Sequence, residues 1–310
     1  MKYYLAPMEG LTGYVYRRAY HNHFHNIDKY FTPFIVNKKM SNKEIRDIHP
    51  DNNKGMEVVP QIMSNRVDDF LSVTKELTTY GYDTVNLNLG CPSGTVTAKR
   101  RGAGFLAVPD QLEEFLAEIY EKSTVKISIK TRIGMKDEGE WERILQIYEK
   151  FPIEELIIHP RLQADFYRGG VRMDTYQKAV ETINVPLCYN GDIDSVEKYE
   201  EFCKAFPQTE RIMIGRGMIK NPGLIQEIKG EPGMTKEILR AFYEELFEGY
   251  QEVLCGDKQM LFKMKEIWSY LGQNFTDSEK YMKKILKANR LSEYDVIVQA
   301  LFREQELLTK

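Results

Sequence analysis

The chain has 310 residues, of which 42% are hydrophobic, and a formal net charge of −3 at pH 7. This composition is sufficient for one large α/β domain and a smaller second one, and it excludes disorder on a large scale. The small negative charge gives no overall electrostatic signature of nucleic-acid binding, so any contact with RNA would require a local basic surface.

The apolar runs, such as residues 155–159, are much shorter than the about 20 residues that a membrane helix needs. The N-terminus reaches Pro7 too early for a secretory signal. We therefore expect a cytoplasmic protein with no membrane partner. The four cysteines Cys91, Cys188, Cys203 and Cys255 lie far apart without C-x-x-C spacing, which argues against a zinc ribbon and a disulfide framework.

Short apolar or β-branched runs recur through the first two thirds of the chain, each followed by a segment with helical periodicity. Eight of them are predicted as strands, at residues 4–6, 34–36, 58–62, 84–87, 126–129, 156–158, 186–189 and 211–214. This alternation predicts a (β/α)₈ TIM barrel. An open doubly wound sheet is the alternative, and the lack of Gly-x-Gly-x-x-Gly after the first strand disfavours a dinucleotide-binding version of it.

Glycine and proline concentrate in residues 229–234, and the strand pattern ends there. We therefore predict a barrel domain at residues 1–230 and a helical domain at residues 235–310. Apolar residues at i, i+3 and i+4 predict helices within 239–250 and 260–271. Capping-box patterns at Thr276 and Ser292 predict the starts of two more, which would complete a bundle of about four helices.

Polar residues follow most of the predicted strands. In a barrel the carboxyl ends of the strands meet at one mouth, where reactive side chains gather. The residues in this position are Pro7 to Glu9, Gln61, Asn88 with Cys91, Lys130 with Arg132, His159 with Arg161, Asn190 to Asp192, and Gly215 with Arg216. The segments after the seventh and eighth strands contain glycine and Arg216, and they indicate a phosphate site, which barrels often form there.

These motifs resemble the tRNA-dihydrouridine synthase family. The resemblance is carried, in order and spacing, by Leu5-Ala6-Pro7-Met8-Glu9-Gly10, Gln61, Asn88-Leu89-Gly90-Cys91-Pro92-Ser93, Lys130-Thr131-Arg132-Ile133-Gly134, His159-Pro160-Arg161, Asn190-Gly191-Asp192-Ile193 and Met213-Ile214-Gly215-Arg216-Gly217. It spans most of the predicted barrel, whereas the helical part is similar mainly in length and helical character.

The resemblance implies an FMN-containing catalytic barrel with a helical tRNA-binding domain, here residues 235–310. It would reduce the C5–C6 double bond of particular uridines in tRNA, with NADPH or NADH as the reductant and NAD(P)+ as the acceptor in the reverse sense. By motif position, FMN would be held by Pro7, Met8, Gln61, Lys130, His159, Asn190, Gly191, Asp192, Gly215 and Arg216. Cys91 would donate the proton to C5, as a general acid. We expect a monomer.

Because the resemblance implies tRNA binding, several polar and basic residues become candidates for contacts with tRNA. Lys280, Lys283, Lys284 and Lys287, the lysine stripe, share one side of a predicted helix, with Tyr281, Met282, Ile285 and Leu286 opposite. Arg290 would extend it. The other candidates are Asn88, Arg161, Arg168, Arg172 and Lys99, Arg100 and Arg101, which lie in a segment predicted to be mobile and to close over a polyanion.

The chain departs from the family pattern at Thr95, Pro160 and Pro33. His21, His23 and His25 would share a face of a strand, but no carboxylate or cysteine cluster accompanies them, and we predict no metal site. Cys188, Cys203 and Cys255 are predicted to be packing residues. Two other functions stay open: an FMN-barrel oxidoreductase acting on a small enoate- or dihydroorotate-like molecule, and a tRNA-binding or folding protein with secondary flavin chemistry.

Overall fold

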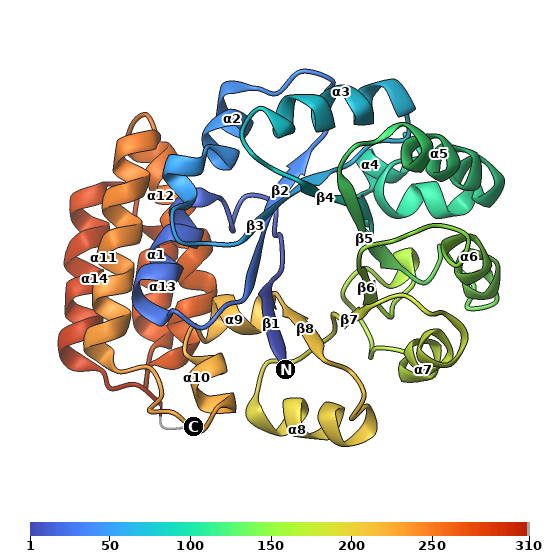
Figure 1. The fold of residues 1–310 in the computed structure, drawn as a ribbon. Coiled ribbons are helices and arrows are strands. Elements are labelled where there is room, and N and C mark those ends of the chain that lie inside the picture. The colour runs from blue at the N-terminus through green and yellow to red at the C-terminus, as the bar shows by residue number, and fades with distance from the viewer. Residues whose placement is uncertain (309–310) are drawn as a thin grey trace. The chain divides into compact units, whose positions relative to one another are not determined.

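Eight parallel strands close into a barrel in the order in which they occur along the chain (Figure 1). The computed structural model describes residues 1–308. The strands are β1 (Lys2–Leu5), β2 (Lys29–Ile35), β3 (Val58–Ile62), β4 (Thr84–Leu89), β5 (Lys126–Arg132), β6 (Leu156–His159), β7 (Leu187–Tyr189) and β8 (Arg211–Ile214). The predicted TIM barrel is confirmed.

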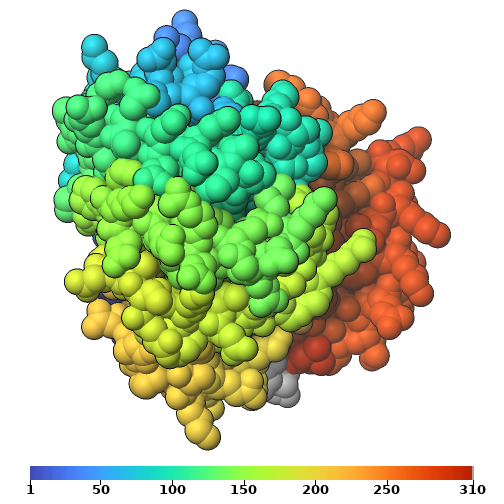
Figure 2. All heavy atoms as spheres, turned by 90° about the vertical axis from the view of Figure 1, so that its right-hand side faces the viewer, coloured from blue at the N-terminus to red at the C-terminus, as the bar shows by residue number. Residues whose placement is uncertain are grey.

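Helices follow the strands in the expected alternation. They are α1 (Tyr14–Phe24), α2 (Asn42–Ile48), α3 (Val67–Thr78), α4 (Gly94–Thr97), α5 (Pro109–Lys122), α6 (Glu140–Tyr148), α7 (Met173–Thr182), α8 (Val196–Ala205), α9 (Arg216–Lys220) and α10 (Leu224–Ile228), with 3₁₀ turns η1 (Pro50–Asn53), η2 (Gly102–Ala107) and η3 (Gln163–Asp165). In Figure 2, α5, α6 and α7 form successive bands from teal through green to yellow-green. Their apolar sides are buried, and their charged sides face solvent.

The second strand is longer than predicted, because Pro33 hides its pattern. Proline has no amide for the ladder, and strands tolerate it mainly at bulges. The register of β2 against β3 shifts between Phe31 and Phe34, which places one extra residue in β2. The hydroxyl of Thr32 accepts the hydrogen bond from the Gln61 amide at 3.0 Å. The bulge thus leaves Gln61 paired and fixed next to the carboxyl end of β3.

The barrel interior is packed with apolar side chains, grouped around Tyr4, Ala6, Phe31, Val59, Ile157, Cys188 and Met213. Complete burial of each large side chain contributes about 1.5–3 kcal/mol. Cys188 belongs to this buried group, so its prediction as a packing residue is confirmed. Cys203 is half-buried, whereas Cys255 is exposed, so its prediction as a packing residue is wrong. All four cysteines are free thiols.

A buried carboxylate closes the amino-terminal end of the barrel. Glu155 accepts a hydrogen bond from the Tyr4 hydroxyl at 2.8 Å and lies 3.1 Å from Nε of Arg211. Lys29 lies 3.9 Å from its other oxygen. Burial nevertheless raises the pKa of Glu155 above its ordinary value. The cations and the tyrosine compensate a charge that would otherwise be costly to bury, which is a structural role at the face opposite the mouth.

The chain folds into two compact units. The first contains all eight strands and spans Met1–Tyr14, Asp28–Asp192 and Cys203–Ile214. The second combines Val15–Ile27, Ile193–Phe202 and Gly215–Lys310. This division differs from the predicted boundary in residues 229–234, because α1 and the segment from Gly215 onward pack mainly within the second unit.

The second unit contains the predicted four-helix bundle. Its helices are α11 (Lys236–Val253), α12 (Asp257–Leu271), α13 (Glu279–Lys287) and α14 (Leu291–Glu304), with the 3₁₀ turn η4 (Gly272–Asn274). Figure 1 shows α1, in blue, beside these orange and red helices. The Phe242 ring of α11 lies 5.6 Å from Tyr16 and 5.3 Å from Phe24 of α1. The bundle core therefore includes a helix that the chain forms before its second strand.

The two predicted capping boxes are wrong. Helix α13 begins after Ser278, whose side chain makes no cap, and Thr276 instead bonds the Glu306 amide at 3.1 Å. Helix α14 begins at Leu291, one residue before Ser292. Both motifs lie near helix starts. Thr276 makes a tertiary contact instead of a cap, and α14 starts too early for Ser292 to cap it. The start of α11 has a cap that was not predicted, in which the Thr235 hydroxyl accepts from the Ile238 amide.

The three histidines lie on or just after α1 rather than on a strand. His23 Nε2 lies 2.9 Å from Glu245, and the rings of His21 and His25 are 5.7 Å apart. Among residues 1–308 no group of three or more His, Cys, Asp or Glu side chains has an arrangement that could hold a metal ion. Over the same residues, none of the helices combines the length and apolar character needed to cross a membrane.

Candidate active site

Cys91 lies two residues beyond the end of β4 and is half-buried. The Asn88 side chain shapes its backbone. Oδ1 of Asn88 accepts hydrogen bonds from the amides of Gly90 and Cys91, both at 3.0 Å. Asn88 is itself buried, with 8% of its surface exposed. We predicted Asn88 as a substrate contact; its observed bonds also make it the residue that turns the chain at Cys91.

Burial raises the pKa of the Cys91 thiol above its ordinary value. Glu9 acts in the same direction, whereas a backbone hydrogen bond from Ser93 and the charges of Arg132 and Lys130 oppose the shift. Since burial dominates, the thiol keeps its proton at neutral pH. A protonated thiol is suited to donating a proton and poorly suited to acting as a thiolate nucleophile or metal ligand.

The carbonyl groups beside Cys91 are also held. Nε of Arg132 donates to the Gly90 carbonyl at 3.0 Å, and the Ala103 amide donates to the Cys91 carbonyl at 3.0 Å. Gly102 has φ +54°, and a Cβ there would lie 2.9 Å from Cβ of Cys91. Any side chain at Gly102 would thus collide with Cys91 and strain the backbone. The η2 turn can approach the thiol this closely only because Gly102 lacks a side chain.

The basic segment after Cys91, predicted to be mobile, folds into hydrogen-bonded turns. It contains α4 and leads into η2. The Asn65 side chain donates to the Lys99 carbonyl at 3.1 Å and accepts from Nε of Arg101 at 3.4 Å. Lys99 and Arg100 are exposed, and Arg101 is half-buried. Their side chains remain candidate contacts for a polyanion, presented from a folded segment.

A chain of hydrogen bonds links the inner face of the barrel to the Cys91 loop. Nδ2 of Asn88 donates to Oε1 of Gln61 at 2.7 Å, and Nε2 of Gln61 donates to Oδ1 of Asn86 at 2.7 Å. Nδ2 of Asn86 then donates to the Ser128 hydroxyl at 2.9 Å. Gln61 and Asn86 are fully buried. Each amide orientation is therefore fixed by its neighbours, because reversing one would place two donors or two acceptors together.

Asn86 and Ser128 were not among the predicted site residues. A signal was present, because Asn86 and Asn88 alternate on β4 and therefore share its inward face. Two amides facing the inside of an otherwise apolar strand need partners. The partner Ser128 lies in β5 directly beside Asn86. The sequence could have indicated a buried polar network, although not its members on the adjacent strand.

Lys130 is a cation without a partner. It lies near the carboxyl end of β5 and is half-buried, and among residues 1–308 its Nζ makes no hydrogen bond or ion pair. Burial, with a smaller effect from Arg132, lowers the pKa of Lys130 to about 8. A buried cation with no counter-charge costs free energy in the folded protein. An anionic ligand at this point would offset that cost.

Replacing Lys130 by methionine should stabilise the ligand-free protein at pH 7, by roughly 2–4 °C for each 1 kcal/mol of relieved burial cost. The folded pKa of about 8 lies below the ordinary 10.5, so the unfolded chain binds the proton more tightly. Wild-type stability should therefore rise with pH between about 8 and about 10.5, and the variant should lack this rise. Thermal denaturation across this range measures it; identical pH profiles would contradict the unpaired cation.

His159 ends β6 and is oriented by Arg161. Nε2 of His159 lies 3.1 Å from a guanidinium nitrogen of Arg161. Since arginine only donates, Nε2 must accept and the proton lies on Nδ1, which makes the ring neutral. The same guanidinium binds both carboxylate oxygens of Asp192 and donates to the Gly169 carbonyl at 2.6 Å.

The contact between Arg161 and Asp192 changes the roles that were predicted for both residues. Arg161 was predicted to contact substrate and Asp192 to contact the cofactor. Arg161 is only 1% exposed, and its carboxylate partner is Asp192. In the structure the two form an ion pair, with Arg161 buried and Asp192 partly exposed, whose local effect is to hold the His159 ring. The partner of a buried arginine, 31 residues away in sequence, could not be identified from motifs alone.

Pro7 and Met8 follow β1, where the chain makes a tight turn. The Met8 amide donates to the Thr12 hydroxyl at 2.7 Å, and its carbonyl accepts from the Thr12 amide at 3.0 Å. Thr12 is fully buried. The turn is thus held by a threonine that the sequence analysis did not single out, and the backbone of Pro7 and Met8 has a fixed course.

The segment after β7 is held in a similar way. Nδ2 of Asn190 donates to the Met213 carbonyl at 2.8 Å. A Cβ at Gly191 would lie 2.1 Å from the Tyr189 hydroxyl, so this position requires glycine for close approach. The predicted phosphate-binding backbone at Asn190–Asp192 therefore has a defined conformation.

Gly215 and Arg216 follow β8 directly. Gly215 is the N-cap residue of α9, and its carbonyl accepts from the Met218 amide at 3.0 Å. Arg216 is the first residue of that helix. Both remain predicted cofactor contacts, at a helix start of the kind that binds anions.

The lysine stripe lies on α13, and its four lysines are exposed, as is Arg290 after the helix. Tyr281 and Ile285 are buried on the other side, as predicted. Leu286, predicted to lie with them, is 50% exposed. The helix therefore presents four exposed lysines and one exposed apolar residue.

The two further arginine candidates differ in accessibility. Arg168 is exposed, and it follows the exposed rings of Phe166 and Tyr167. Arg172 forms an ion pair with Asp165 and another with Glu138. Of the two, Arg168 is better placed to contact a phosphate.

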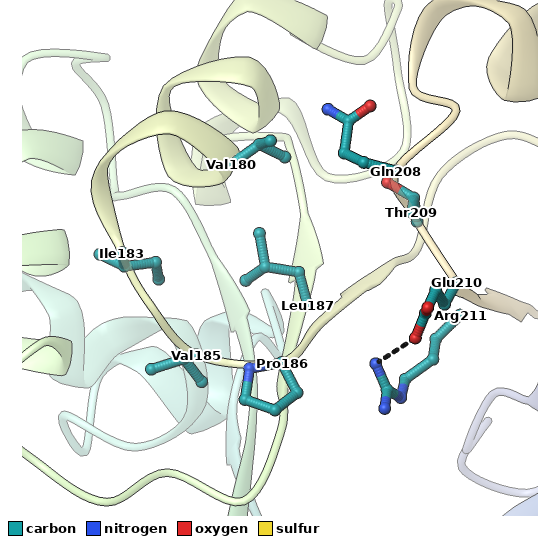
Figure 3. Close-up of a pocket in the computed structure, with 9 residues that line it drawn as sticks. All are labelled: Val180, Ile183, Val185, Pro186, Leu187, Gln208, Thr209, Glu210 and Arg211. Carbon is teal, nitrogen blue, oxygen red and sulfur yellow. Dashed lines mark ion pairs between the residues drawn. The ribbon is translucent and has the colours of Figure 1, made fainter.

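A pocket of about 210 Å³ lies at the other end of the barrel strands (Figure 3). It is lined by Val180, Ile183, Val185, Pro186, Leu187, Gln208, Thr209, Glu210 and Arg211. These residues precede or begin β7 and β8, whereas Cys91 and His159 lie at or beyond the carboxyl ends of their strands and Lys130 lies two residues before the end of β5. The pocket is therefore separate from the candidate site.

A closed parallel barrel with ionisable side chains at the carboxyl ends of its strands defines an enzyme of the TIM-barrel class. The family model described as dihydrouridine synthase (Dus) matches residues 4–308. The chain belongs to the dihydrouridine synthase family, which confirms the resemblance inferred from its motifs.

Relatives with curated names agree with this family. tRNA-dihydrouridine synthase B of Pasteurella multocida is 28% identical over 72% of this chain and 67% of that protein. tRNA-dihydrouridine synthase B of Vibrio parahaemolyticus is 33% identical over 56% of this chain and 58% of that protein. A probable tRNA-dihydrouridine synthase of Staphylococcus epidermidis is 26% identical over 80% of this chain and 78% of that protein.

Solved structures with a similar fold include morphinone reductase, at a TM-score of 0.51 and 11% identity over 78% of this chain and 88% of that chain. An old yellow enzyme homologue from Zymomonas mobilis gives a TM-score of 0.52 at 12% identity, over 82% of this chain and 96% of that chain. At such identities the likeness shows the barrel fold alone.

Proposed function

We propose that the protein reduces the C5–C6 double bond of particular uridines in tRNA, with bound FMN and with NADPH or NADH as the source of electrons. The observation that carries this proposal is the half-buried Cys91 thiol, held by Asn88 just beyond the carboxyl end of β4, next to the strand whose Lys130 has no anionic partner among residues 1–308. Membership of the dihydrouridine synthase family supports the same chemistry.

The residues at the mouth fit an anionic flavin. Lys130 supplies a cation that nothing else in residues 1–308 pairs. Gln61 keeps one amide hydrogen and one oxygen lone pair beyond its bonds to Asn86 and Asn88. The residues proposed to hold FMN are Pro7, Met8, Gln61, Lys130, His159, Asn190, Gly191, Asp192, Gly215 and Arg216, with Asp192 acting through Arg161 and His159.

When bound, reduced FMN supplies a hydride for C6 of uracil. Cys91 then gives its proton to C5, which completes the saturated ring and leaves a thiolate that solvent protonates again. Lys130 stabilises negative charge that develops in the mouth. The buried Asn88–Gln61–Asn86 network keeps Cys91 in a constant position while the proton moves.

Uracil within tRNA is stacked, so the nucleotide must be extruded before it can enter a barrel mouth. Extrusion requires the rest of the tRNA to be held by its backbone. The exposed lysine stripe, Arg290, Lys99, Arg100 and Arg168 are the proposed phosphate contacts. We also propose that the protein acts as a monomer, which sedimentation in the presence and absence of tRNA tests.

The purified protein should carry flavin absorbance near neutral pH, and the released cofactor should be FMN on chromatography. The loss of that absorbance on addition of NADPH or NADH measures the rate of flavin reduction by each and so compares the two reductants. The reduced protein should form dihydrouridine in tRNA lacking the modification. A colourless protein that free FMN cannot reconstitute would refute the proposal, and turnover of small enoates without tRNA would favour the small-molecule alternative.

A further inference from the structure

The loop after β6 contacts the Cys91 loop from a distant part of the chain. Nε2 of Gln163 donates a hydrogen bond to the Pro92 carbonyl at 2.9 Å, across 71 residues of sequence. Gln163 is half-buried and opens the η3 turn. Pro92 directly follows Cys91. The contact therefore holds the exit of the chain from the proposed proton donor.

The turn that carries Gln163 is firmly anchored. The Gln163 amide donates to the Gly134 carbonyl at 2.9 Å, and the next amide, of Ala164, donates to the Met135 carbonyl at 3.0 Å. Asp165 accepts from the Leu162 amide at 2.8 Å. A side chain on such a fixed backbone loses little further freedom when it makes its bond, so it can restrain its partner effectively.

Arg132 joins the same two loops. Besides its bond to the Gly90 carbonyl, its guanidinium donates to the carbonyls of Leu162 at 2.8 Å and Phe166 at 2.6 Å. Arg132 is fully buried. The β6 loop is thus tied to both sides of Cys91, through Arg132 at Gly90 and through Gln163 at Pro92.

The backbone polar groups of residues 90–92 all have partners. Asn88 binds the amides of Gly90 and Cys91, Arg132 binds the Gly90 carbonyl, and Ala103 binds the Cys91 carbonyl. The Pro92 carbonyl depends on Gln163. Of these partners, Gln163 is the side chain that a single substitution can remove without disturbing the barrel strands, because it lies outside them.

We propose that Gln163 is a positioning residue for Cys91, acting through the Pro92 carbonyl to fix the thiol in the geometry of proton transfer. The proposal rests on the proposed role of Cys91 as proton donor. Proton transfer requires approach to within about 3 Å, and a misplacement of about 1 Å can cost roughly a hundredfold in rate. Loss of this bond should therefore affect the chemical step more than the binding of tRNA.

The test compares Gln163→Ala and Gln163→Glu with Gln177→Ala. Glutamate keeps the shape but removes the donor. Gln177 is a matched control, since it lies on α7 and its side chain donates to Glu181 of the same helix. We expect kcat for dihydrouridine formation to fall by about tenfold to a hundredfold in both Gln163 variants. The KM for tRNA, the flavin content and the melting temperature should stay within about twofold or a few degrees of wild type.

Alkylation of the Cys91 thiol by iodoacetamide, followed by mass spectrometry of the intact holoprotein, gives a readout independent of activity. A loop released at Pro92 should react severalfold faster at Cys91, while the exposed Cys255 reacts at an unchanged rate. Unchanged kcat and unchanged Cys91 alkylation would overturn the proposal, as would a raised KM for tRNA with kcat intact, which would make Gln163 an RNA contact.

The variant Cys91→Ala distinguishes a failure of the positioning role of Gln163 from a failure of the proposed function. If Cys91→Ala leaves dihydrouridine formation intact, the proposed acid is wrong, and an altered Cys91 alkylation rate in Gln163→Ala would then have no consequence for turnover. If Cys91→Ala abolishes turnover and the Gln163 variants match Gln177→Ala in both readouts, only the positioning role is refuted.

Discussion

Dihydrouridine formation by Cys91→Ala should be slower than that of the wild type by about 10²–10⁴-fold, because this is the contribution that a positioned general acid makes. The substitution removes the only proposed proton source at C5. Flavin binding should be unaffected, since Cys91 contributes no charge to the mouth while its thiol stays protonated. Single-turnover measurement with pre-reduced protein and unmodified tRNA isolates this step from flavin reduction.

The control for this result is Cys255→Ala, which removes an exposed thiol and should leave the rate unchanged. The pH profile gives a second check. Because burial raises the pKa of the Cys91 thiol, the loss of rate that comes from its deprotonation should appear only above the ordinary thiol range, at higher pH than the titration of Lys130, whose pKa in the ligand-free protein is about 8. Unchanged dihydrouridine levels in cells carrying Cys91→Ala would instead favour a tRNA-binding protein whose flavin chemistry is secondary.

The strand pattern was sufficient to predict the barrel, because buried parallel strands read as apolar runs at regular intervals. It failed locally at β2, where Pro33 breaks the run and a bulge with Thr32 restores the ladder. A bulge depends on the neighbouring strand, and single-strand patterns contain no information about it.

The principal site residues could also be predicted from the sequence, since Cys91, Lys130 and His159 all lie within two residues of the carboxyl ends of their strands. The interactions between these residues could not be predicted from the sequence. The ring of His159 is held by Arg161, whose charge is compensated by Asp192 after another strand. Such relations arise from the closure of the barrel, which brings together residues that are separate in the chain.

The place of α1 in the second unit also depends on contacts between residues that are distant in the sequence. Its periodicity predicts an ordinary barrel helix after the first strand. Instead, Val15 contacts Gly249 of α11 so closely that a Cβ at Gly249 would lie 2.8 Å from it. Glycine at this position permits the approach of two helices, and its purpose is visible only when the partner is known.

Reversing two charges of the lysine stripe, with Lys283→Glu and Lys284→Glu together, should weaken tRNA binding by on the order of tenfold to a hundredfold at about 0.1 M salt. Both lysines are exposed on α13. Each phosphate contact releases counterions, so losing two should reduce the slope of log affinity against log salt by about two. Filter binding or fluorescence anisotropy over a salt series measures both quantities.

The control carries the same change in net charge elsewhere. Lys75→Glu with Lys204→Glu reverses two exposed lysines of α3 and α8, outside the stripe. If the stripe contacts phosphates, this control should lower affinity only slightly and keep the salt slope, whereas the stripe variant changes both and retains its flavin. Equal effects in the two variants would mean that tRNA responds to overall charge, and the RNA surface would then have to be sought elsewhere, first at Arg168 and at Lys99 and Arg100.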